Sequence, residues 1–554
     1  MAAGFVFFSL DFAWRALAGS VLALAAVLVW VLTSVILRNR KSALWFVPGP
    51  SSANWLLGNL KQLNDSPDDI ILDKWAAAYG KVVRLNAFLE SPLMFITDTK
   101  ALNHIFLHSS EYPRPEYIRR DLSKILCEGL LCTEGEKYKQ QRRVLNPAFG
   151  PGQIREATNI FFEKAIELRN QWAAKIENGQ QLARIDALHG LNLATLDAIG
   201  LAAFDHDFEA LNPEKKPNEL AEVMERVFSM PNQKPILVLL KNLSPLLNYL
   251  TDPNMPLVDH AVRLMRSAGS KLIEERKAEI LREMSGEKKP GMGRNAMQGR
   301  DVLSLLVKAN IAPDIPESQP LTDEDVLAQV PTFMVAGHET TSDATAWCLY
   351  ALTQAPSVQS KLRDELSKVD TDSPSMDELM ALPYLDMVVR ETLRLHAPVT
   401  STVRVATQHD VIPLDAPFTG RDGVQHHSLE VPEGTMFLIS ILALHRSKEL
   451  WGDDALEFRP ERWENPPEAT SDIPGVWGHL LTFGGGPRAC IGYRFAVVEM
   501  KALIFTLVRA FEFELAVHPA EIRTMPGIVL RPYLSRAPEA GSQMPLIIQR
   551  CDRL

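Results

Sequence analysis

One cysteine near the C-terminal end lies in the stretch whose residue types are best suited to chemistry. Cys490 follows an aromatic residue, three glycines, a proline and an arginine: Phe483, Gly484, Gly485, Gly486, Pro487 and Arg488. The apolar run 495–508 comes soon after it and predicts a helix. Backbone N–H groups at a helix N-terminus stabilise a thiolate, which suits it as an axial ligand of haem iron. Arg488 is placed to pair with a haem propionate. The competing interpretation is a glycine-rich turn around a structural cysteine.

This stretch resembles the signature of the cytochrome P-450 family of haem-thiolate monooxygenases. The family pattern is Phe-x-x-Gly-x-Arg-x-Cys-x-Gly, and the chain carries all its fixed positions: Phe483, Gly486, Arg488, Cys490 and Gly492. The resemblance implies haem b as cofactor, Cys490 as the ligand of its iron, and Phe483 and Arg488 as cofactor-binding neighbours. It also implies a mostly α-helical fold with a small β-rich part.

A second motif interrupts a long apolar helix that we predict from the capping-box-like Thr322 to Gln354. The segment 336–341, Ala-Gly-His-Glu-Thr-Thr, is a poor choice for a helix interior, and such local conflicts often mark function. Without the family, a Ser/Thr kink in a buried helix would explain it as well. The family has Ala/Gly-Gly-x-Asp/Glu-Thr-Thr/Ser here. The resemblance implies that Gly337 leaves room above the iron, that Thr340 hydrogen-bonds dioxygen and a water, and that Glu339 relays protons from solvent. We assign no role to His338.

Three further residues resemble the family's propionate-binding positions. The segment 135–143 starts a helix, and the family usually places Trp-x-x-x-Arg on it, where this chain has Tyr138 and Arg142. Positions i and i+4 share one helix face, so the geometry survives the change from Trp to Tyr, while the role of the Tyr138 ring stays open. Arg404 occupies the third such position. The competing interpretation of the 135–143 segment is a basic, solvated helix face.

A charged triad is predicted to be structural. Glu391 and Arg394 lie three residues apart on a helix beginning near Tyr384, and such residues face the same side. In the family this pair is buried and joined by an arginine from a later loop, which is Arg462 here. We expect the three to support the thiolate side of the haem without taking part in catalysis.

Three further strands and two loops are predicted in the domain. Residues 82–86 and 93–97 predict a pair of strands, and a third strand is expected at 435–440. The charged segment 271–301, which contains the run Pro-Gly-Met-Gly at 290–293, predicts a surface loop. The apolar loop 525–529 is expected to reach back into the substrate pocket.

The N-terminus predicts a membrane anchor. Residues 16–37 carry no charge and are long enough to cross a bilayer as one helix. Arg38, Arg40 and Lys41 follow at once, which predicts a cytosolic C-terminal side. The alternative, a cleaved signal peptide, normally has a shorter apolar region. We therefore expect an anchor at 1–45, a proline-rich hinge at 46–60, and a haem-thiolate monooxygenase domain at 61–554. The expected location is the endoplasmic reticulum membrane, with a single pass and a cytosolic catalytic domain.

Composition limits the other partners. The net charge of −10 argues against nucleic-acid binding, which needs a basic face. The five cysteines are scattered and odd in number, unlike a disulfide framework or a zinc site. The chain has no Gly-x-Gly-x-x-Gly after a strand, so NADPH-derived electrons would come from a separate flavoprotein reductase. Lys139 and Arg143 are candidates for docking it.

The resulting interpretation is a monooxygenase that inserts one oxygen atom of O₂ into a lipophilic small molecule, by hydroxylation or epoxidation. The pattern looks like fungal microsomal members, many of which act on terpenoid or other secondary-metabolite skeletons. One alternative is a peroxide-dependent or isomerising haem-thiolate enzyme, although such members tend to depart from the Glu339–Thr340 pair. Another is a non-enzymatic haem carrier or sensor. The substrate, the position of oxidation and the number of successive oxidations do not follow from the sequence.

Overall fold

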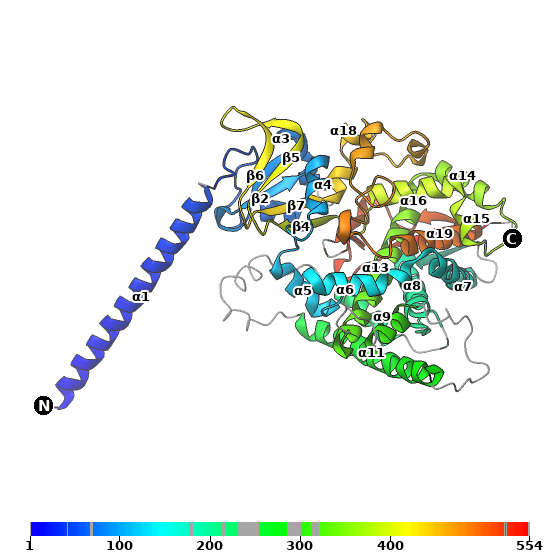
Figure 1. Cartoon of the computed structure of the whole chain (residues 1–554), viewed down its shortest axis with the longest axis horizontal. Coiled ribbons are helices and arrows are strands. Elements are labelled where there is room, and N and C mark those ends of the chain that lie inside the picture. The colour runs from blue at the N-terminus through cyan, green and yellow to red at the C-terminus, as the bar shows by residue number, and fades with distance from the viewer. Residues whose placement is uncertain are drawn as a thin grey trace.

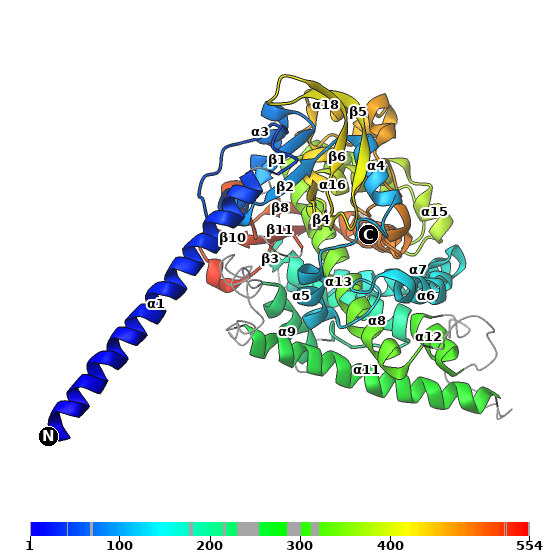
Figure 2. The same cartoon turned by 60° about the vertical axis from the view of Figure 1, so that its left-hand side comes forward.

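Helices dominate the part of the chain that the computed structural model describes, which confirms the expected fold class. The described residues are 2–40, 42–66, 70–176, 181–212, 214, 218–229, 254–284, 301–311, 321–525, 527 and 529–551. One long helix, α13 (Asp323–Gln354), crosses the middle of the helical part (Figures 1 and 2). The other helices of the domain are α2 (Leu60–Asp65), α3 (Ile70–Tyr79), α4 (Thr99–Leu107), α5 (Glu116–Leu126), α6 (Gly135–Leu145), α7 (Pro151–Lys175), α8 (Ala187–Phe204), α9 (Glu219–Phe228), α11 (Met255–Met284), α12 (Val302–Ile311), α14 (Pro356–Leu366), α15 (Met376–Met380), α16 (Pro383–Leu395), α17 (Ile441–His445), α18 (Lys448–Trp451) and α19 (Tyr493–Ala510).

Helix α13 begins and packs as its sequence leads one to expect. Thr322 accepts a hydrogen bond from the N–H of Asp325 through its hydroxyl (3.1 Å), and the Asp325 carboxylate accepts one from the N–H of Thr322 (3.1 Å). This is the predicted capping box with Asp in place of Glu. The helix packs against α8 and α19, and almost all its residues from Val326 to Leu352 are buried. Its mostly apolar surface on all sides is typical of a central core helix.

The β-rich part is built from strands far apart in the sequence. Its main sheet has the order β1 (Val82–Asn86), β2 (Pro92–Ile96), β7 (Met436–Ser440) and β4 (Ser401–Val405). β1 and β2 are antiparallel, as predicted, whereas β2 and β7 are parallel. The smaller sheets are β3 (Leu182–Asp186), β11 (Pro545–Arg550) and β8 (Phe511–Leu515), then β5 (Asp410–Thr419) with β6 (Gln425–Val431), and β9 (Ile522–Met525) with β10 (Arg531–Leu534).

The N-terminal helix α1 (Ala2–Arg40) extends away from the rest of the molecule (Figure 1). Its apolar part, Ala18–Arg40, is long enough to cross a membrane and is not buried by protein. Helix α8 passes the same test of length and composition, but 83% of it is buried, so it is a core helix. The segment predicted as a hinge packs on the sheet: Val47 is buried, and the N–H of Arg84 in β1 donates to the carbonyl of Pro48 (2.8 Å). Its role as a hinge between the anchor and the domain stays a prediction.

The predicted loop at 271–301 is wrong over its first half. Residues 271–284 belong to α11, which lies along one edge of the helical part (Figure 2). Leu272, Ile273 and Ile280 are buried on one side of this helix, and its charged residues face solvent. The high content of charged residues led to the prediction of a loop, although a narrow stripe of apolar residues is enough to pack this helix. Residues 285–300 lie outside the described part of the chain. So do Pro526 and Ile528 of the loop expected to reach the pocket.

Candidate active site

The loop that carries Cys490 is held closed by its own backbone and by the close approach of another segment. The N–H of Cys490 donates to the carbonyl of Phe483 across the loop (2.8 Å). Gly486 begins the short 3-10 turn η7 (Gly486–Arg488) with a φ of 63°, a conformation that favours glycine. A Cβ atom there would lie 2.3 Å from the carbonyl oxygen of Phe106, so only glycine fits. The spacing Phe-x-x-Gly therefore shapes a rigid loop that ends at Cys490.

Cys490 is accessible, yet it lies deep in the protein. Its side chain is exposed, although burial raises the pKa of its thiol. We take both observations to mean that the exposed surface faces a space inside the protein. The backbone N–H of Gly492 donates to the sulfur, and this bond and the charge of Arg142 favour the thiolate. These are the backbone donors that the sequence predicts at the start of α19.

A short face in the middle of α13 is accessible although most residues on either side of it are buried. Ala336 is exposed and Gly337 and Thr340 are partly exposed, whereas Val335, His338, Glu339 and Thr341 are buried. Ala336 and Thr340 are four residues apart and so share one face. The Thr340 hydroxyl donates to the carbonyl of Ala336 (2.9 Å), which leaves its lone pairs free to accept. This face can hold a water or another small donor.

Gly337 serves helix packing in this structure. A Cβ atom at this position would lie 2.5 Å from a side-chain carbon of Ile199 in α8. The missing side chain therefore lets α8 approach α13 closely. The sequence predicts instead that Gly337 leaves room above the iron. Any contact of Gly337 with a cofactor stays a prediction, and it would involve the backbone.

Several arginines gather beside the cysteine loop with few opposing charges. Burial lowers the pKa of Arg404 and of Arg488 to about 9, and repulsion by Arg114 adds to both shifts. Burial also lowers the pKa of Arg114 itself. Arg404 donates to Thr402 (2.5 Å) and to the carbonyl of Val403 (2.9 Å), both neutral groups. The sequence predicts Arg404 and Arg488 as cofactor-binding residues, but it gave no signal for Arg114, which stands between two prolines in a loop.

The carboxylate paired with this cluster belongs to Glu134, which contacts Arg488. One carboxylate against several buried guanidinium groups leaves a local excess of positive charge. Haem b is planar and carries two propionates, which would supply the missing negative charge. The accessible Cys490, the accessible face of α13 and this cationic cluster therefore fit haem as the cofactor.

Tyr138 and Arg142 reach the cysteine loop directly. The Tyr138 hydroxyl donates to the carbonyl of Pro487 (2.7 Å), and Arg142 donates to the carbonyl of Ala489 (2.8 Å) and to the Tyr138 oxygen (3.3 Å). The Arg488 guanidinium stacks over the Tyr138 ring at 3.4 Å from its centroid. The i, i+4 pair thus shares one helix face, as predicted. Its members brace the loop in this structure, and their contact with a propionate stays a prediction.

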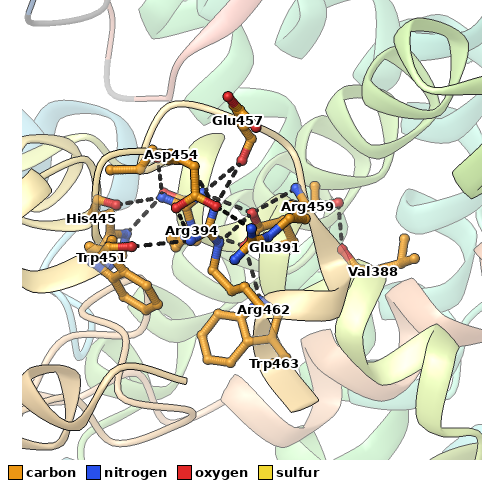
Figure 3. Close-up of polar contacts among 12 residues, drawn as sticks. Val388, Glu391, Arg394, His445, Trp451, Asp454, Glu457, Arg459, Arg462 and Trp463 are labelled. Atoms are coloured by element: carbon orange, nitrogen blue, oxygen red, sulfur yellow. Dashed lines mark hydrogen bonds and ion pairs between the residues drawn. The ribbon is translucent and has the colours of Figure 1, made fainter. Parts of the chain in front are cut away.

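The triad of Glu391, Arg394 and Arg462 is buried and closely bonded (Figure 3). The Glu391 carboxylate accepts two bonds from Arg394 (2.8 and 2.9 Å) and one from Arg462 (3.0 Å). It also accepts one from the Trp463 indole (3.0 Å) and one from the backbone N–H of Arg459 (2.9 Å). Arg394 donates further to backbone carbonyls, and Arg462 to Asp454 (2.9 Å). The triad therefore ties α16 to the loop 451–463.

His445 connects this triad to the cysteine loop. Its Nε2 accepts a hydrogen bond from the N–H of Leu481 (2.8 Å), two residues before Phe483. Its Nδ1 must then carry the proton and donates to the carbonyl of Arg394 (3.1 Å). Burial and the charge of Arg394 lower the pKa of His445 to about 3, so it is neutral at physiological pH. A neutral histidine thus fixes the distance between α16 and the cysteine loop.

Glu339 is fully buried and paired, which the sequence does not indicate. Its carboxylate contacts the guanidinium of Arg531 in β10 and lies 2.9 Å from Nε2 of His338. Burial opposes ionisation, but Arg531 and His338 outweigh it and hold the pKa of Glu339 below its ordinary value. Arg531 belongs to no motif recognisable in the sequence, since only the tertiary fold brings β10 to α13. Glu339 therefore reaches solvent only through other groups.

Comparison with known proteins agrees with this geometry. The family model described as Cytochrome P450 matches residues 48–536. Cytochrome P450 monooxygenase 205 of Postia placenta is 51% identical over 525 residues, covering 95% of this chain and 96% of that protein. Cytochrome P450 monooxygenase claQ of Ampulloclitocybe clavipes is 32% identical over 541 residues, covering 95% and 97%. Ganoderic acid synthetase CYP5150L8 of Ganoderma lucidum is 34% identical over 500 residues, covering 86% and 89%. The family match and the coverage agree with the cysteine loop: the chain belongs to the cytochrome P450 family and is a cytochrome P450 monooxygenase.

Proposed function

We propose that this monooxygenase binds haem b through Cys490 and uses NADPH-derived electrons to insert one oxygen atom of O₂ into a lipophilic small molecule. The observation that carries the proposal is the accessible Cys490 beside a buried excess of arginines. Haem held by a thiolate supplies the cleavage of the O–O bond that oxygen insertion requires.

The residues of this chain have distinct tasks around that group. Cys490 binds the iron, and the Gly492 N–H stabilises its charge. Arg142, Arg404 and Arg488 would hold the propionates, and Tyr138 and Phe483 would pack beside the haem. Thr340 accepts a hydrogen bond from a water on the accessible face of α13, and Glu339 passes a proton towards it.

The first experiment is the absorption spectrum of the reduced, carbon-monoxide-bound protein. Wild type should show the red-shifted Soret band of a thiolate-bound haem, and Cys490→His should bind haem without it. Cys551→Ser is the matched control and should keep the band. Wild-type protein that binds haem without the band would refute the proposed ligand. Following NADPH-dependent oxygenated product with a reductase then separates a monooxygenase from a peroxide-dependent enzyme or a haem carrier.

We place the protein in the endoplasmic reticulum membrane, with one span and the catalytic domain in the cytosol. The support is the unburied apolar part of α1, Ala18–Arg40, followed by basic residues. The protein should stay with membranes at alkaline pH, and protease added outside sealed microsomes should digest the catalytic domain. Protection of that domain from protease would contradict this topology.

The electron donor that we propose is a separate flavoprotein reductase that docks near Lys139 and Arg143. Both side chains are exposed on α6, and Lys139 is paired with the exposed Glu136 (2.7 Å). Such surface charges act mainly on the rate of association. Lys139→Glu with Arg143→Glu should slow reductase-supported turnover at low salt, and unchanged turnover would contradict this assignment.

A biosynthetic substrate of terpenoid or other secondary-metabolite type is the narrower proposal. A membrane anchor favours a molecule delivered from the bilayer, and one relative is named a ganoderic acid synthetase. Candidate terpenoids, fatty acids, polyketides and aromatic compounds should be screened for substrate-induced shifts of the Soret band. Binding by aromatic xenobiotics alone would argue against a biosynthetic role.

A further inference from the structure

Asp343 is a buried carboxyl group that none of the family motifs includes. It lies on α13 four residues after Glu339, so the two share one face of the helix. Its side chain is completely buried, and both its oxygens lack a hydrogen-bond partner among the residues that the structure describes. An ionised carboxylate in such a place is very costly, so Asp343 holds a proton. Burial accordingly raises the pKa of Asp343 well above its ordinary value.

The path of Arg531 brings its guanidinium past Asp343. The Trp347 indole donates to the carbonyl of Leu530 (2.8 Å), which fixes the start of β10 one helical turn beyond Asp343. From there the Arg531 side chain reaches Glu339, one turn before Asp343. Glu339, Asp343 and Trp347 follow each other at intervals of four residues, about 6 Å each along the helix axis. Arg531 therefore spans the turn of the helix on which Asp343 lies.

Arg531 also has an unused donor. Its Nε is buried and has no hydrogen-bond partner in the described part of the chain. The charges that act on Asp343 are those of Arg531 and Glu339. One arginine thus lies between two carboxyl groups, of which one is ionised and the other holds a proton. A change in the Arg531 side-chain torsions would move the guanidinium from Glu339 towards Asp343.

We propose that Asp343 is a second proton-carrying group of this monooxygenase, which exchanges a proton with Glu339 while Arg531 changes partner between them. In this step the O–H bond of Asp343 breaks and an O–H bond forms on Glu339. Arg531 stays cationic and pairs with the new carboxylate, so the net charge of the three groups does not change. Glu339 then gives its proton towards Thr340, and solvent protons restore Asp343. The proposal deepens the proposed function and rests on it.

A first test reads the proton on Asp343 without turnover. The infrared spectrum of wild type near neutral pH should contain a carbonyl band of a buried carboxylic acid that Asp343→Asn lacks. Asp343→Ser is the second variant, in case the amide is not tolerated. Glu499→Gln is the matched control, because Glu499 in α19 is also a buried carboxyl, but the residue beside it is Thr341. It should keep the Asp343 band. If neither Asp343 variant loses a band, Asp343 is ionised and the proposal fails.

A second test compares two sources of oxygen with the substrate found in the screen. Reductase-supported product formation needs protons from the protein, whereas added hydrogen peroxide brings its own. Asp343→Asn should lower the reductase-supported rate about tenfold and change the peroxide-supported rate by less than about twofold. Glu499→Gln should change neither rate. An equal loss by both routes would show a merely structural role and overturn the proposal. Wild type without NADPH-dependent product would refute the proposed function instead, while the infrared test still decides the proton on Asp343.

Discussion

Replacing Glu391 by glutamine removes the charge at the centre of the buried triad and keeps its shape. The carboxylate accepts five hydrogen bonds from Arg394, Arg459, Arg462 and Trp463. A glutamine has one acceptor oxygen, so its NH₂ group would face donors. Breaking a buried ion pair costs about 3–5 kcal/mol. We expect about 3 kcal/mol, because carbonyls and Asp454 still hold the two arginines.

The assay is thermal unfolding followed by intrinsic fluorescence, together with the haem content per chain. An unfolding entropy of about 2.1 cal/mol/K per residue, over the roughly 490 residues that match the family, gives about 1 kcal/mol per degree. Glu391→Gln should therefore lower the melting temperature by about 3 °C. It should also lower the haem content, because His445 links Arg394 to the cysteine loop.

The matched control is Asp377→Asn, which breaks an exposed ion pair with Arg155 (3.1 Å) on the surface. Exposed pairs contribute about 0–1 kcal/mol, so this variant should melt within about 1 °C of wild type. If Glu391→Gln also melts within 1 °C of wild type and keeps its full haem content, the triad is not a stabilising element. That result would refute the reasoning.

Three further changes test the neighbourhood of the cysteine loop. Arg114→Met should raise the melting temperature of haem-free protein, because it removes repulsion on Arg404 and Arg488. It should also weaken haem binding in a titration, because it removes one positive charge from the cluster; unchanged haem affinity would show that this charge does not help to hold the haem. His445→Gln should flatten the acid loss of stability. The folded state of wild type, with the His445 pKa at about 3, binds no proton there between pH 6.5 and 3 while the unfolded chain does, so stability falls as pH falls. Urea unfolding at pH 7 and 5.5 gives the change of unfolding free energy with pH. This change should be smaller in His445→Gln than in wild type by up to about 1.4 kcal/mol per pH unit, and equal changes in the two proteins would refute the prediction. Tyr138→Phe should cost about 1 kcal/mol by losing the bond to Pro487, and no loss in urea unfolding would show that the bond contributes nothing.

The ordered motifs made the family predictable from the sequence. The loop has Phe483, Gly486 and Cys490 at the spacing of the family pattern. Position 486 admits only glycine, because its φ is 63° and the Phe106 carbonyl lies close to it. The capping box at Thr322 and the strand pair β1–β2 are local features and were predictable for the same reason. The prediction of a loop at 271–301 was wrong over 271–284, because it gave more weight to the many charged residues than to the narrow apolar stripe of the helix.

Other features depend on contacts between distant segments. No local pattern indicated that Arg531 pairs with Glu339 or that Arg114 repels Arg404 and Arg488. Nor did any local pattern indicate that Asp343 lacks a hydrogen-bond partner in the described part of the chain. Charge interactions between distant segments depend on the distances between the groups in space, and these distances are known only from the folded structure. The packing role of Gly337 could not be predicted either, because it depends on Ile199 of α8, which lies where a side chain at position 337 would be.

The sequence by itself determined the chemistry available to this protein: a cysteine in a glycine loop, a Glu-Thr pair inside a long helix, an arginine set and an apolar N-terminal helix. These follow from residue type and spacing, which act over one or two turns of chain. Tertiary structure decided which charges meet. Burial removes the water that would screen them, so the position of each partner sets which carboxyl is ionised and which holds a proton. That is why Glu339 is paired, whereas Asp343, four residues later on the same helix, has no hydrogen-bond partner among the residues that the structure describes.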